Sequence, residues 1–83
     1  MSAAPATPPD LQRIRATGAR ATPARLAVLH LLDGADHALS HREVEEALGG
    51  GFDRVTLYRV LDWLVSSGLG HRTIDPERVF RFS

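Results

Sequence analysis

The side chains best suited to specific recognition lie in the segment 54–67, whose apolar residues recur with a helical period. On a helix, Thr56 and Arg59 would face outward and Tyr58 would lie at the boundary with the core. A guanidinium can pair with O6 and N7 of guanine or with a phosphate, and rings or methyl groups can contact thymine methyl groups. The alternative is that Tyr58 is a core-edge residue and Arg59 is merely solvated, and spacing alone does not separate the two interpretations.

The other side of the same segment is apolar and must face a core. It carries three leucines at helical spacing: Leu57, Leu61 and Leu64. Trp63 falls on the outer half, where a tryptophan without a packing partner is uncommon. We expect Trp63 to pack against the first helix or another chain rather than to contact DNA.

Capping residues and glycines divide the rest of the chain into helices that position this segment. A short first helix begins around Asp10. The predicted N-caps of the next three are Thr22, followed by Pro23; Ser40, with Glu43 completing a capping box; and Asp53. The glycines that end the helices are Gly18, Gly49–Gly51 and Gly68. The second helix, from Pro23 to about Asp33, should present Val28, Leu31 and Leu32 on one face, with Leu29 on the flank.

Two segments after the last helix are rich in β-branched and aromatic residues, 69–73 and 78–83, and the turn 74–77 with its proline separates them. The resulting fold is mainly α with a small β-hairpin, a winged helix-turn-helix of four helices followed by a two-stranded wing. Phe80 and Phe82 alternate onto one side of the last strand, so one of them should close the base of the wing over the core.

Composition restricts the class of protein. With 83 residues and 43% hydrophobic content, the chain can form one small domain. We expect a disordered N-terminal arm over residues 1–9 and a winged-helix DNA-binding domain over 10–83. The absence of cysteine removes disulfides and thiolate metal sites. No signal peptide or membrane span is recognisable, which favours a soluble, cytoplasmic protein with no membrane partner.

Charge does not by itself indicate a nucleic-acid partner. Ten basic residues, all arginine, balance ten acidic ones. The distribution is uneven, because residues 1–30 carry a net charge of +3, residues 31–50 of −4 and residues 51–83 of +1. An argument for DNA binding therefore depends on local arrangement.

Other groupings of reactive residues are weak. Asp33, Asp36, His37 and His41 include metal-binding residue types, but no helical spacing holds them together, and we expect solvated loop residues. No nucleophile with a base, no carboxylate pair and no phosphate-binding loop followed by lysine is visible, so we expect no enzyme activity.

Several segments together resemble the N-terminal DNA-binding domain of the ferric uptake regulator family, which comprises bacterial metal-responsive transcription regulators. These are GARATPARL at residues 18–26, Leu39-Ser40 ahead of Glu43, VTLYRVL at residues 55–61 and SGL at residues 67–69. The similarity extends from Asp10 to Ser83, and TLYRVL after a helix cap is its most specific part.

The resemblance implies a set of DNA contacts. Tyr58 and Arg59, together with Thr56, would face bases or phosphates in the major groove, and Arg20 would approach the minor groove or the backbone. Further candidates for backbone contacts are Arg25, Arg54 and Arg72.

The sequence also departs from the family pattern. A second domain supplies the family's dimer interface and most of its metal ligands, whereas this sequence stops at Ser83. We therefore expect an excised domain or a truncated relative, which would dimerise only if a C-terminal domain were present. At two family positions for interdomain metal ligands stand Ala38 and Arg81, and His37 is one residue away from the first. We expect no metal site and no cofactor in this chain, although a full-length parent would bind Zn or Fe.

These observations predict sequence-specific binding to a duplex DNA operator, with helix 54–67 in the major groove. The alternative is a winged-helix module for protein–protein contact that does not bind DNA. Salt dependence distinguishes the two, because phosphate contacts weaken steeply as salt rises.

Overall fold

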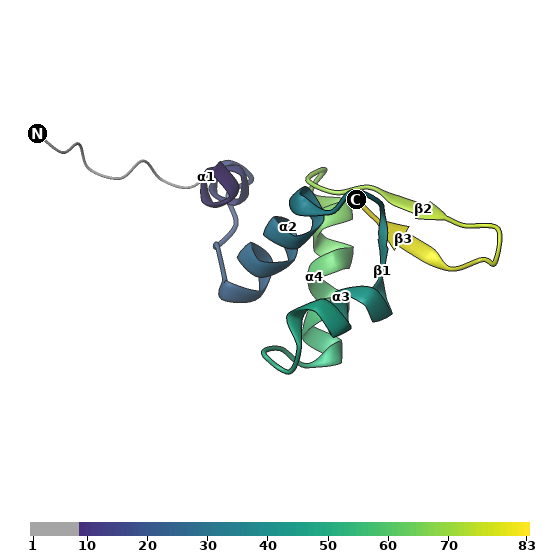
Figure 1. The fold of residues 1–83 in the computed structure, drawn as a ribbon. Helices are drawn as coiled ribbons and strands as arrows, with labels where there is room; N and C mark the ends of the chain where they lie inside the picture. The colour runs from purple at the N-terminus through teal and green to yellow at the C-terminus, as the bar shows by residue number, and fades with distance from the viewer. Residues whose placement is uncertain (1–8) are drawn as a thin grey trace, which may run out of the picture.

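The computed structural model describes residues 9–83, which form a helical body with a β-sheet projecting from one side (Figure 1). Its elements follow in the order α1 (Pro9–Ala16), α2 (Pro23–Gly34), β1 (Leu39–Ser40), α3 (His41–Leu48), α4 (Arg54–Ser66), β2 (Arg72–Ile74) and β3 (Phe80–Phe82). The prediction of a mainly α winged helix-turn-helix is confirmed. The predicted arm lies outside the described residues apart from Pro9, where α1 begins.

The three predicted N-caps position the helices as expected. The Thr22 side chain accepts a hydrogen bond from the backbone N–H of Arg25 at 3.2 Å, and Asp53 accepts from the backbone N–H of Thr56 at 2.7 Å. Ser40 and Glu43 form the complete capping box at the start of α3. Each cap satisfies a backbone N–H that the helix itself leaves without a partner.

The sheet of the described residues has one strand more than the prediction. β3 lies between β1 and β2 and is antiparallel to both, with Leu39 opposite Phe82 and Ile74 opposite Phe80. The prediction of a two-stranded wing missed β1 because it consists of two residues directly before a helix cap, too few to show a periodic pattern.

The first wing strand begins later than predicted because the end of α4 uses the preceding amides. Gly68, at φ 83°, donates to the Val65 carbonyl at 3.2 Å, and Leu69 donates to the Leu64 carbonyl at 3.0 Å. This is the Schellman arrangement, which commits both N–H groups to the helix end. The strand predicted over 69–73 therefore begins later than expected; it also ends later, because β2 spans Arg72–Ile74.

The wing tip is a three-residue loop rather than the predicted turn over 74–77. The N–H of Arg78 donates to the Asp75 carbonyl at 2.9 Å, and the N–H of Asp75 donates to the Val79 carbonyl at 3.0 Å. Pro76 follows Asp75 in this turn, and Arg78 adopts a left-handed conformation with φ 64°. A turn followed by one left-handed residue is a common three-residue hairpin connection.

The core lies between α2, α3 and α4, and α1 packs against α2 to add Ile14 to it. Seven apolar side chains have at most 1% of their surface exposed: Ile14, Val28, Leu29, Val44, Leu57, Leu61 and Leu64. Burying such a side chain contributes about 1.5–3 kcal/mol. On α2 the prediction exchanged two residues, since Leu29 is buried and Leu31 only half-buried.

Phe82 closes the base of the wing at 5% exposure, as expected for one of the two phenylalanines, whereas Phe80 is 49% exposed. Phe80 lies two residues before Phe82 on β3, opposite Ile74.

Among residues 9–83, no helix is long and apolar enough to span a membrane.

Candidate nucleic-acid interface

The first half of α4 presents an open face. Arg59 is exposed, Tyr58 is 54% exposed and Val55 is 56% exposed. Thr56 is only half-buried rather than fully exposed as predicted, because it faces the first turn of α2 across a notch. Aromatic, apolar and cationic groups thus share one helical face.

Asp53 lies at the start of this face and is occupied by its capping role. Hydrogen bonding to Thr56 is the main cause that holds the pKa of Asp53 below its ordinary value, and the nearby charge of Arg59 lowers it further. The carboxylate is therefore ionised at neutral pH and offsets part of the positive charge near Arg59.

On the α3 side, Tyr58 borders a groove of about 730 Å³ that is lined by both basic and acidic residues. The ring of His41 meets the ring of Tyr58 edge-on, with centroids 5.3 Å apart. Glu45 lies 3.1 Å from Arg54 and 3.4 Å from His41. Because Glu45 already pairs with it, Arg54 is a weaker candidate for a phosphate contact than its position in the sequence suggested.

Arg25 reaches across from α2 to α4. Its guanidinium lies 4.1 Å from the centroid of the Trp63 ring, and its Nη1 donates to the backbone carbonyl of Arg20 at 2.9 Å. Trp63 is partly buried against the core and its ring contacts Arg25 of α2, whereas the sequence led us to expect a partner on the first helix or on another chain. Sequence periodicity placed Trp63 on the outer half of α4 but could not identify a partner 38 residues away.

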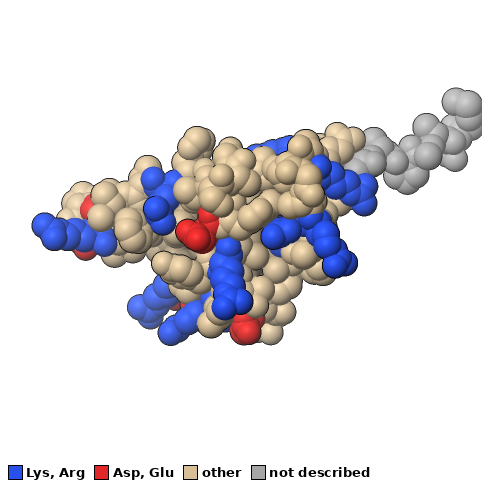
Figure 2. All heavy atoms as spheres, turned by 180° about the vertical axis from the view of Figure 1, so that it is seen from behind, with Lys and Arg blue, Asp and Glu red and all other residues tan. Residues whose placement is uncertain are grey.

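Arginines differ in whether an acid already neutralises them. Within residues 9–83, those that form ion pairs are Arg13, Arg42, Arg54, Arg72 and Arg81. Those that form none there are Arg15, Arg20, Arg25, Arg59 and Arg78. From behind, arginine side chains extend from the wing to the helical body with few acidic side chains between them (Figure 2).

The arginines predicted to contact DNA therefore differ, because Arg54 and Arg72 already pair with acids. Arg20, Arg25 and Arg59 lie without ion pairs around the junction of α2 and α4, within the described part of the chain. Arg72 lies on the wing, with its guanidinium 5.0 Å from the Phe80 ring and its Nη1 3.9 Å from Asp62.

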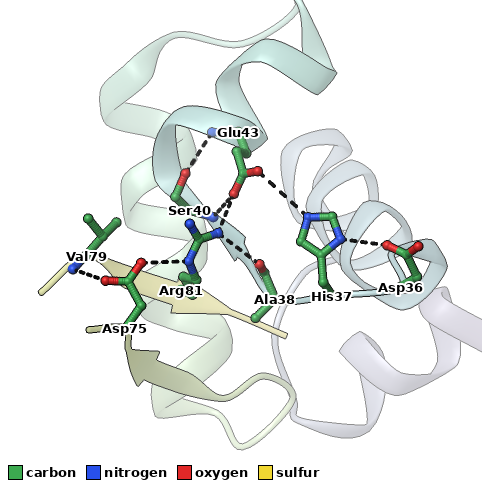
Figure 3. Close-up of polar contacts among 8 residues, drawn as sticks. All are labelled: Asp36, His37, Ala38, Ser40, Glu43, Asp75, Val79 and Arg81. Atoms are coloured by element: carbon green, nitrogen blue, oxygen red, sulfur yellow. Dashed lines mark hydrogen bonds and ion pairs between the residues drawn. The ribbon is translucent and has the colours of Figure 1, made fainter. Parts of the chain in front are cut away.

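A separate polar cluster, which the sequence analysis did not predict, ties the wing to α3 (Figure 3). The Arg81 guanidinium donates through Nε to Asp75 at 2.9 Å, and through Nη1 to Glu43 at 2.7 Å and to the Ala38 carbonyl at 3.3 Å. Asp75 also accepts from the N–H of Val79 at 2.9 Å. One side chain thus joins β3, the wing turn, α3 and the segment before β1.

Electrostatics within this cluster follow from its hydrogen bonds. The pKa of Glu43 lies below its ordinary value, chiefly because the Ser40 backbone N–H donates to it, and Arg81 adds to the effect. The pKa of Asp75 is lowered first by the Val79 N–H and then by Arg81. The pKa of His37 is raised by its hydrogen bond to Asp36.

The two positions where the family resemblance places metal ligands, Ala38 and Arg81, are in direct contact. A guanidinium, which cannot bind a cation, stands there. No group of three or more histidine, aspartate and glutamate residues in the described chain could hold a metal ion.

Helix-turn-helix geometry with an attached sheet defines the protein as a winged helix-turn-helix domain. No protein-family model and no curated protein matches the chain in sequence. Solved structures do match it. The ferric uptake regulator of Vibrio cholerae has 25% identity and a TM-score of 0.80, over 88% of this chain and 59% of that one.

Two further regulators agree. The manganese-containing ferric uptake regulator of Pseudomonas aeruginosa has 28% identity and a TM-score of 0.82, over 92% of this chain and 60% of that one. The iron-containing regulator of Francisella tularensis has 32% identity and a TM-score of 0.64, over 77% and 52%. The resemblance to the DNA-binding domain of the ferric uptake regulator family is thus confirmed. The chain spans 52–60% of the length of these regulators.

Proposed function

We propose that this chain binds duplex DNA sequence-specifically as the winged-helix part of a transcription regulator of the ferric uptake regulator type, with α4 in the major groove. The observation that carries the proposal is the exposed face of α4, where Tyr58, Arg59 and Val55 stand clear of the core. A major groove accepts a helix of this kind, and these groups match the edges of guanine and thymine.

The surrounding charges support the same orientation. Arg20 lies just before α2 and Arg25 lies in its first turn, both without ion pairs among residues 9–83, in positions suited to the phosphates that flank the groove. If Arg20, Arg25 and Arg59 each neutralise one phosphate, the logarithm of affinity should fall with the logarithm of salt concentration with a slope of about −2.7. A single module buries only about 600–1,000 Å² of protein surface, so binding to one half-site should be weak.

The test is a fluorescence-anisotropy titration of AT-rich operator duplexes at several salt concentrations. Arg59→Ala should weaken binding by about 1–3 kcal/mol and relax sequence preference if the contact to guanine is bidentate. Arg20→Ala should weaken all sequences alike if it touches only the backbone. Equal binding by the wild type and by the double variant Tyr58→Ala/Arg59→Ala would refute the proposal.

A protein-contact module is the second candidate, and the wing provides the observation that favours it. Ile74, Val79 and Phe80 are exposed by 59%, 41% and 49%. Exposed apolar side chains that lie together can mark a protein interface. An interaction of this kind would depend on these three side chains and respond little to salt, whereas the DNA interaction would depend on α4.

A further inference from the structure

A notch of about 450 Å³ lies between the first turn of α2 and the outer face of α4. Its polar lining comes from both helices: Thr22 and Arg25 from the start of α2, Thr56 and Arg59 from α4. Phe52 and Trp63 supply apolar walls. No acidic side chain of the described chain lines the notch, although Asp53 precedes α4 and is engaged as its cap.

Arg25 is held in this notch by two contacts that leave most of its donors free. The Trp63 ring supports the guanidinium at 4.1 Å, and one nitrogen donates to the Arg20 carbonyl. A guanidinium has five N–H donors in a planar fork, and stacking on an aromatic ring uses its face rather than its edge. The edge remains able to donate in bidentate fashion to a phosphate.

We propose that this notch binds one phosphate of the DNA backbone through Arg25, and that Trp63 is the positioning residue that orients Arg25 for the contact. The inference rests on the proposed function and extends it by placing a phosphate-binding site next to the exposed face of α4 that would contact the bases. Trp63 itself touches no DNA. Because Arg25 also bonds the Arg20 carbonyl, the stack on Trp63 additionally fixes the backbone that carries Arg20.

A positioning role for Trp63 predicts a different experimental result from a purely structural role. A tryptophan that only fills space would change protein stability and leave the salt dependence of DNA binding unaltered. A tryptophan that orients Arg25 should change the number of phosphates neutralised. Each phosphate contributes about 0.9 to the slope, which corresponds to about eightfold in affinity at 0.1 M salt relative to 1 M.

The experiment measures the binding of an operator duplex by Arg25→Gln, Trp63→Leu and Trp63→Phe across salt concentrations, with thermal unfolding as a folding control. Arg25→Gln and Trp63→Leu should each reduce the magnitude of the slope by about 0.9, and Trp63→Phe, which keeps an aromatic face, should restore most of it. The double variant Arg25→Gln/Trp63→Leu should bind like either single variant. Arg13→Gln is the matched control, because it removes the same charge from an arginine already paired with Asp33.

Each outcome bears on a different claim. A wild-type slope kept by Arg25→Gln while Arg59→Ala weakens binding overturns the notch and leaves the proposed function intact. Effects of Arg25→Gln and Trp63→Leu that simply add overturn the positioning role of Trp63. If the wild type binds no duplex even at low salt, the proposed function fails and the notch fails with it. Should Trp63→Leu not fold, Arg25→Gln still tests the phosphate contact, and Trp63→Met replaces Trp63→Leu as the variant without an aromatic face.

Discussion

Arg78 at the wing tip offers a sharp test of the hairpin geometry. It is the one non-glycine residue of the described chain with a positive φ, 64°, and its side chain is exposed. A left-handed conformation costs a residue with a Cβ about 1–2 kcal/mol. Glycine avoids that cost but loses about 0.5–1 kcal/mol more conformational entropy on folding. We therefore expect Arg78→Gly to stabilise the fold by about 0.5–1 kcal/mol.

Thermal unfolding followed by circular dichroism, in the absence of DNA, measures this effect. A change of about 1 kcal/mol shifts the Tm of a domain of this size by about 4–8 °C. Glu77→Gly is the matched control, since Glu77 is an exposed neighbour without a positive φ, and glycine there should lower Tm. An Arg78→Gly variant no more stable than the wild type, or a Glu77→Gly variant equally stabilised, would show that the turn is not the one described.

Three other outcomes are expected. Thr22→Ala removes the N-cap of α2 and should cost about 1 kcal/mol, seen as a lower Tm, whereas Thr22→Ser should keep the cap and the stability. The Ser40 N–H and Arg81 lower the pKa of Glu43 in the folded protein, so the ionised Glu43 side chain stabilises the fold fully above its unfolded pKa near 4.5. This stabilisation is lost as the pH falls through the lower folded pKa. Glu43→Gln should therefore flatten the dependence of Tm on pH in that acid range, and an unchanged profile would contradict the assignment. Calorimetry should find no micromolar or tighter zinc site that depends on His37 and His41, because neither belongs to a three-ligand group in the described chain.

Local sequence signals predicted most of the fold. Caps and terminating glycines act on their own neighbours in the chain, and for this reason Thr22, Ser40 and Asp53 began their helices where predicted. The leucine spacing of α4 fixed its buried side, and this left the opposite face, with Arg59, outward. Where several local signals competed for one amide, as at Leu69, the helix end prevailed over the strand.

Contacts between distant residues required the tertiary structure. Trp63 and Arg25 carry no local signal for one another, yet packing of α4 on α2 places the guanidinium on the ring. Likewise Arg81 meets Glu43 only because β3 pairs with β1, which leads directly into α3. Sequence by itself determined which faces are apolar and where helices begin, since both depend on residues a few positions apart. Tertiary structure decided which arginines are already neutralised by acids and which remain free to meet a phosphate, because charge pairing depends on distance in space.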